Sequence, residues 1–171
     1  HTVLLRSDGR AVACGRSEPD VCEIPELEVG VLYTQVSAGS DQTVLLRSDG
    51  RVATCGGNGF GQRNIPELEA GVVYAQVSAG YGHTVLLRSD GRAVACGRSE
   101  PDVCEIPELE VGVLYTQVSA GSDQTVLLRS DGRVATCGGN GFGQRNIPEL
   151  EAGVVYAQVS AGYGHTVLLR S

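Results

Sequence analysis

The chain has 171 residues and a formal net charge of −7, and its basic residues are all arginines interspersed with carboxylates. The lack of a basic patch argues against nucleic-acid binding, and no apolar run approaches the roughly 20 residues of a membrane-spanning helix. Hydrophobic residues make up 42% of the chain, which is enough for a core. No signal peptide is visible, so we expect a cytoplasmic location if the protein is expressed in a cell.

The main feature of the sequence is internal repetition. Residues 1–89 are identical to residues 83–171, which defines an 82-residue unit. The unit consists of two related halves, A (1–41) and B (42–82), which agree at 24 of 41 positions. Repeats of this length indicate a solenoid, a propeller or an array. Identity without a single substitution points to a designed protein or to a very recent duplication.

We therefore interpret the chain as one repeat domain. Its repeats are 1–41, 42–82, 83–123 and 124–164, followed by a seven-residue closing or spare strand, 165–171.

Each repeat predicts three strands, which in the first repeat are His1–Ser7, Arg10–Cys14 and Val31–Ala38. Asp8-Gly9 between the first two is a strong hairpin signal and predicts a type I′ turn, which needs positive φ at both central residues. The segment 15–30 contains prolines, which cannot donate to a strand ladder, so it is expected to be a loop.

The first strand of the repeat carries apolar groups on both faces. Val3 and Leu5 point to one side, and Thr2 and Leu4 to the other, so both faces are expected to be covered. No segment shows sustained helical periodicity. The sequence therefore predicts an all-β fold, a β-propeller with roughly 41-residue blades of three to four antiparallel strands.

Two segments carry a resemblance to a known family. The run 83–92, followed by Cys96-Gly97, resembles the regulator of chromosome condensation repeat, and 56–62 (GGNGFGQ) is similar to that family's Gly-x-Asn-x-x-Gly-Gln signature. The A halves depart from it at 15–21, where the Asn and the later Gly and Gln are missing. The resemblance covers the whole chain and implies a propeller, normally of about seven blades.

The activities known in that family do not carry over. They include nucleotide exchange on a nuclear GTPase, ultraviolet-B perception and β-lactamase inhibition. Other members are domains of large ubiquitin ligases. The chain has no Trp cluster, no inserted wedge and no irregular aromatic loops. The resemblance implies only a general protein-binding role.

The six cysteines fall at two repeat positions. Four follow small or β-branched residues at an expected strand end, and two occur only in the A halves (Cys14, Cys55, Cys96, Cys137; Cys22, Cys104). A Cys14–Cys22 disulfide is one interpretation. Reduced, largely buried thiols are favoured, because free Cys behaves as a small hydrophobe and the spacing does not suit zinc.

Histidine recurs at the start of the first strand, at His1, His83 and His165, and glutamine takes this position at Gln42 and Gln124. A ring of alternating His and Gln could serve as a metal or pH-responsive site. We favour a strand-end histidine bonded to backbone or water.

No motif predicts catalysis. Asp8-Gly9 is explained by turn chemistry, and Glu26 and Glu28, on one face around Leu27, are expected in water. The glycine-rich segment 56–61 lacks the Lys-Ser/Thr of a phosphate-binding loop, so it is expected to form a tight turn. We predict no enzyme activity, no catalytic residue, no cofactor and no metal.

Aromatic residues specific to the B halves are the candidate partner surface: Phe60, Tyr81, Phe142 and Tyr163. The alternative is that they fill gaps between blades, which we favour because aromatics contribute the largest burial available here.

We therefore predict a structural scaffold, an engineered symmetric propeller without catalytic activity. The alternative is a protein-binding module of a natural domain of this family, for example from a ubiquitin ligase. Because 165–171 repeats 1–7, four repeats could close with one strand displaced, two chains could join into eight blades, or the chain could be a segment of a longer array. A closed homodimer is favoured, and neither a nucleic acid nor a membrane is expected as a partner.

Overall fold

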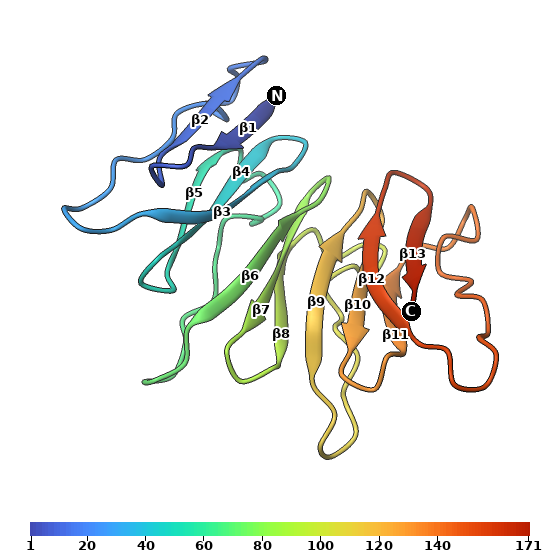
Figure 1. Cartoon of the computed structure of the whole chain (residues 1–171). Helices are drawn as coiled ribbons and strands as arrows, with labels where there is room; N and C mark the ends of the chain where they lie inside the picture. Colours follow the sequence, from blue (N-terminus) through green and yellow to red (C-terminus); the bar gives the residue numbers. More distant parts are fainter.

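The computed structural model describes residues 1–171 and contains only β-strands and loops (Figure 1). The strands are β1 (Thr2–Leu5), β2 (Ala11–Cys14), β3 (Tyr33–Ala38), β4 (Gln42–Arg47), β5 (Val52–Gly56), β6 (Tyr74–Ala79), β7 (His83–Arg88), β8 (Ala93–Gly97), β9 (Tyr115–Ala120), β10 (Gln124–Arg129), β11 (Val134–Gly138), β12 (Tyr156–Ala161) and β13 (Thr166–Arg170). The all-β prediction is confirmed. No helix of the length and hydropathy needed to cross a bilayer is present.

Three complete blades form the middle of the molecule. They are the antiparallel sheets β3-β4-β5, β6-β7-β8 and β9-β10-β11, in which the second strand lies in the centre. Partial sheets flank them: β1-β2 has a second and a third strand, and β12-β13 has a first and a second. The sheets follow one another along an arc (Figure 1). Each complete blade therefore takes its first strand from one sequence repeat and its other two strands from the next.

The hairpin between the second and third strands differs from the predicted turn. Gly9 has φ of 76°, but Asp8 is not among the residues with positive φ, so the type I′ prediction is wrong. Gly9 N donates to Arg6 O at 3.0 Å, and Arg6 N donates to Arg10 O at 2.8 Å. The loop thus has three residues, with a glycine in the left-handed region at its end. Asp8 instead accepts a bond from Arg10 N at 3.1 Å.

The core lies between blades. Val44 and Leu46 of β4 pack against Tyr74 and Val77 of β6 and against Leu86 of β7. The same contacts recur at the next two seams, where a seam is the contact between successive blades. Because one face of a second strand meets the following blade and the other meets the preceding one, both faces of that strand are buried. The expectation that both faces are covered is confirmed in the complete blades.

Side chains of the first strands add polar bonds across each seam. Gln35 Oε1 accepts from Val77 N at 2.7 Å, and Ser37 Oγ accepts from Ala79 N at 2.9 Å. The equivalent glutamines and serines bridge the next two seams (Gln76 to Val118, Ser78 to Ala120, Gln117 to Val159 and Ser119 to Ala161). These bonds reach backbone N–H groups that the local strand ladder leaves free, so they fix the register of one blade against the next.

The two ends of the arc expose residues that are buried elsewhere. Val167 and Leu169 of β13 are 58% and 57% exposed, whereas Val44 at an equivalent position is 0% exposed. At the other end Leu4 of β1 is 55% exposed, although Leu86, its copy 82 residues later, is 0% exposed. The ends therefore present two different apolar faces, which meet each other at every internal seam.

Candidate protein-binding face

One face of the arc is formed by the turns between first and second strands and by the loops that follow the third strands. We call it the turn face; its turns are 39–41, 80–82, 121–123 and 162–164. The turns stand side by side because Ser40 N donates to Gly80 O at 3.2 Å and Tyr81 N to Gly121 O at 3.1 Å. A shallow hollow is lined by the small residues that lead into the turns and by Tyr81 and Tyr163.

The four predicted aromatic residues all belong to this face and are substantially exposed. The exposed fractions are 51% for Phe60, 46% for Tyr81, 74% for Phe142 and 72% for Tyr163. Phe60 comes from the loop after β5, and its ring lies against Gly82 in the turn of the next blade. The Phe142 ring lies against Gly164 in the same way. The gap-filling interpretation therefore describes one side of each phenylalanine ring, and the other side is open to solvent.

An arginine specific to the A halves joins this surface. The Arg98 guanidinium lies 5.5 Å from the centre of the Tyr81 ring, within the range of a cation–π contact. It also donates to the Asp123 carboxylate and to Ser122 O in the following turn. In the first repeat Arg16 donates to Asp41 at 3.4 Å. The turn face thus combines exposed aromatic rings with arginines that are paired with aspartates.

Our reading of the sequence missed this Arg–Asp pair. Arg16 and Asp41, like Arg98 and Asp123, are both restricted to the A halves, where the B halves have glycine at each position. The replacement of both residues by glycine in the same half is the sequence signal that links them. The two residues are 25 positions apart, so no local pattern connects them.

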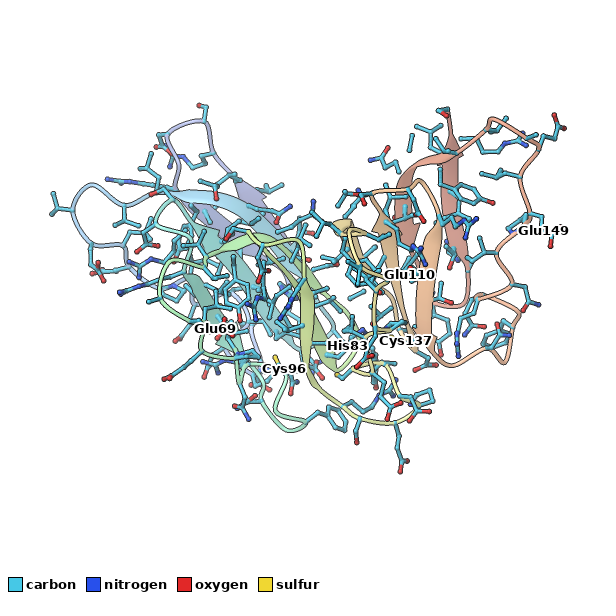
Figure 2. All side chains as sticks on the ribbon, turned by 90° about the horizontal axis from the view of Figure 1, so that it is seen from below. Glu69, His83, Cys96, Glu110, Cys137 and Glu149 are labelled. Carbon is cyan, nitrogen blue, oxygen red and sulfur yellow. The ribbon has the colours of Figure 1, made fainter.

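His83 sits at a seam inside the molecule (Figure 2), whereas His1 is half-buried and His165 is exposed. His83 is 0% exposed, and its Nε2 lies 3.0 Å from Thr125 Oγ1 in the next blade. Because the Thr125 hydroxyl donates to Val103 O at 2.7 Å, it accepts from His83 Nε2–H. The hydrogen of the neutral ring is thus on Nε2, and Nδ1 is buried without a hydrogen-bond partner. Burial, with a contribution from Arg98, lowers the pKa of His83 to about 4.

We expected a strand-end histidine bonded to backbone or water. His83 does lie at the start of a strand, but its partner is a threonine side chain of the next blade. Gln42, at the same repeat position, donates to Gly80 O and His83 O instead. Histidine and glutamine thus secure alternate seams by different bonds. No group of three or more His, Cys, Asp or Glu side chains is arranged to hold a metal ion.

The cysteines are free thiols, and Cys14 and Cys22 are not joined. Cys55 and Cys137 are buried at strand ends, whereas Cys14 is exposed at the end of β2. Burial raises the pKa of Cys96 to about 12 and that of Cys137 to about 11. Thiols protonated to this degree are weak nucleophiles, because the thiolate is the reactive form.

The carboxylates on the opposite face are held in surface ion pairs. Arg47 Nη2 lies 2.7 Å from Asp49 and 3.1 Å from Glu28, and this triad recurs in the next two blades. Burial opposes ionisation of Asp49, but the Arg51 N–H and the Arg47 guanidinium outweigh it and lower the pKa of the carboxyl. Glu26 and Glu28 are exposed, as predicted. Such carboxylates are poorly suited to general acid catalysis.

The glycine-rich segment forms the predicted turn, in which Gly61 N donates to Asn58 O at 3.0 Å. It also positions two residues that the sequence reading overlooked. Gln62 is 2% exposed, and its backbone O accepts from the Thr84 hydroxyl of the next blade. Arg63 donates to Gly56 O at 2.5 Å and to Thr54 Oγ1 at 3.2 Å. In the A halves Val21 fills the place of Gln62.

Comparison with known proteins supports the sequence resemblance. The family model of the regulator of chromosome condensation (RCC1) repeat matches residues 33–62, 74–100 and 115–144, together just over half of the chain. Each matched range begins at the first strand of a complete blade. No curated protein matches the sequence significantly.

Several solved structures share the fold. Prp20p from Saccharomyces cerevisiae matches with a TM-score of 0.68 at 21% identity, over 82% of this chain and 42% of that one. Human WBSCR16 gives 0.69 at 20% identity, over 84% and 46%. The ectodomain of the receptor kinase CR4 from Physcomitrella patens gives 0.72 at 18% identity, over 97% and 46%. The chain thus spans less than half the length of these structures.

The three-stranded blades, the seams between them and the repeat match agree on one assignment. The predicted propeller fold is confirmed, and the chain belongs to the regulator of chromosome condensation (RCC1) repeat family.

Proposed function

We propose that this chain is a non-catalytic scaffold that self-associates into a closed, symmetric propeller of two copies. With four repeats in each chain, the ring has eight blades. The observation that carries the proposal is the identity of residues 1–89 with residues 83–171, by which a second copy can continue the blade-to-blade contacts of the first. At the internal seams the faces of successive blades cover each other, and a second copy of the chain carries the same faces.

An engineered origin is part of this proposal. It is supported by the identity of residues 1–89 with residues 83–171, which leaves no position that distinguishes one 82-residue unit from the next. The absence of catalysis is supported by carboxylates held in exposed ion pairs and by thiols with raised pKa values. A surface that repeats without a break also lacks the single irregular pocket that active sites commonly occupy.

Charged substitutions on the exposed end face test the self-association. Leu4→Asp together with Val12→Asp is expected to weaken the dimer by at least about 100-fold, because burying unpaired charges costs several kcal/mol. The copies of these two residues 82 positions later, Leu86 and Val94, pack in the core of an internal seam. Sedimentation velocity over a concentration series measures the effect. The matched control is Val29→Asp with Val111→Asp, at loop positions that are fully exposed within one chain. Equal dimerisation of both variants would contradict the proposed interface.

A second candidate function is that of a protein-binding module like a natural domain of the family, for example in a ubiquitin ligase. The exposed aromatic residues of the turn face favour it, since aromatic and arginine side chains dominate the binding energy of protein interfaces. Prp20p, which shares the fold, is described as binding Gsp1p and histones. We propose that a segment of a partner protein would anchor an apolar side chain against these rings.

Selection from a random peptide display library tests this second function. Peptides enriched on the native chain are expected to bind at least about tenfold more weakly when Phe60, Tyr81, Phe142 and Tyr163 are all replaced by serine. Val29→Ser with Val111→Ser provides a control with exposed apolar side chains removed elsewhere. Peptides that lose no affinity in the aromatic variant, or that lose it equally in the control, would rule out the aromatic surface as the binding site.

A further inference from the structure

The turn face carries a regular alternation of acidic and aromatic loops. The loops 15–23 and 97–105 of the A halves, which we call the acidic loops, have the sequence GRSEPDVCE, with three carboxylates and one arginine each. The corresponding loops of the B halves, 56–64 and 138–146, have the sequence GGNGFGQRN, with a phenylalanine and no carboxylate. Phe60 therefore lies between two acidic loops along the arc.

Contacts between successive loops make this surface continuous. Pro19, in the middle of the first acidic loop, lies against Gly57 at the start of the loop that carries Phe60. On its other side, the Phe60 ring lies beside Gly82, and Arg98 Cβ at the start of the second acidic loop lies beside the same glycine. The aromatic ring is thus flanked on both sides by an acidic loop.

The carboxylates of the acidic loops are exposed on an anchored backbone. Glu18, Asp20 and Glu23 are all exposed, whereas Val21 among them is 1% exposed. Val21 O accepts from the Thr43 hydroxyl of the next blade at 2.6 Å. The buried valine fixes the loop against the next blade and leaves the three carboxylates in solvent.

These carboxylates have no partner of opposite charge within the chain. The arginine of each acidic loop is paired with an aspartate in a turn of the next blade (Arg16 with Asp41, Arg98 with Asp123). Arg63, the basic residue of the aromatic loop, donates to backbone carbonyls of its own blade. No ion pair includes Glu18, Asp20, Glu23 or their copies. The surface around Phe60 is therefore negatively charged.

We propose that the turn face binds a basic segment of a partner protein, in which lysine or arginine side chains flank an apolar one. This inference rests on the protein-binding function proposed above. The apolar side chain would contact the open side of the Phe60 ring, and the cationic side chains would reach the acidic loops on either side. Opposite charges across an interface speed association and select against partners of the wrong charge.

Removal of the acidic charges tests this inference. The acidic-loop variant combines Glu18→Gln, Asp20→Asn, Glu100→Gln and Asp102→Asn. Asparagine suits the two aspartate positions, which have φ of 56° and 54°, because it tolerates the left-handed region. Peptides that a random display library enriches on the native chain are expected to carry an excess of lysine and arginine. They are expected to bind the acidic-loop variant at least about tenfold more weakly, as read by fluorescence anisotropy.

A matched control removes four charges from the opposite face, as Glu26→Gln, Glu67→Gln, Glu108→Gln and Glu149→Gln. All four glutamates are exposed, and none belongs to an ion pair. The control is expected to bind the peptides within about twofold of the native chain, because charges beyond a Debye length are largely screened. For the same reason, affinity for the native chain is expected to fall as salt is raised from about 50 mM to about 500 mM.

The outcomes separate this inference from the binding function. Peptides that lose affinity when the aromatic residues are replaced, but bind the acidic-loop variant like the native chain, would overturn the basic partner and leave the binding function standing. An equal loss in the acidic-loop variant and in the control would also overturn it, because net charge alone would then explain the loss. If the native chain enriches no peptide, the binding function fails and this inference fails with it.

Discussion

Leu86→Ala is expected to lower the free energy of unfolding by about 3 kcal/mol, as large-to-small changes at buried leucines do. Leu86 is 0% exposed and lies between two blades, against Val44, Leu46 and Val77. Removing its side chain leaves a cavity at the seam, and the strands on either side cannot close it without breaking their ladders. Urea unfolding followed by circular dichroism measures the loss.

Val111→Ala is the control for Leu86→Ala, because Val111 is fully exposed on a loop. Its unfolding free energy is expected to stay within about 0.5 kcal/mol of the native value. If Leu86→Ala were no more destabilising than Val111→Ala, the blades would not share a core, and the arc of packed sheets would be incorrect.

The largest pH effect is expected from His83. Between pH 7 and pH 4 its titration alone should remove about 3 kcal/mol of unfolding free energy. The pKa of His83 is about 4 in the folded chain, against an ordinary value of 6.5. In this range the unfolded chain binds a proton that the folded chain refuses, so stability falls as the pH falls and levels off below about 4. The charged groups that influence this ring are Arg98, which lowers its pKa, and Asp123, which raises it.

His83→Gln isolates this contribution, because glutamine already occupies the same repeat position at residues 42 and 124. Carboxylates such as Asp90, whose pKa is lowered, also destabilise the fold in acid, but they do so equally in both proteins. The difference in unfolding free energy between the native chain and His83→Gln should therefore shrink by about 3 kcal/mol from pH 7 to pH 4. Parallel stability curves would show that His83 is accessible to protons in the folded state.

Much of the fold was predictable, because the repeat multiplies each local signal. Hydrophobic alternation and glycine spacing identified three strands in every repeat, and their apolar groups on both faces required neighbours on both sides. The position in the repeat at which each blade begins could not be predicted from the sequence. A repeat can be counted from any of its positions, and only the sheet pairing shows that a blade begins at Tyr33 rather than at His1.

The errors at the turns and seams have local causes. The Asp-Gly signal suggested a two-residue turn, but Ser7 joins the loop and only Gly9 takes positive φ. The seam contacts depend on residues about 20 to 40 positions apart, such as Thr43 with Val21 and Gln35 with Val77. No local pattern links such pairs. The exchange of Gln62 for Val21 was visible as a departure from the family signature, but its buried position was not.

The measurement that tests the two-chain ring most directly is the mass of the native chain in solution, by light scattering on a sizing column over a range of concentrations. The account predicts a single species of twice the 17.8 kDa chain mass, because a second copy continues the blade-to-blade contacts that the two identical 82-residue units make within one chain. A single species of 17.8 kDa at every concentration would contradict it.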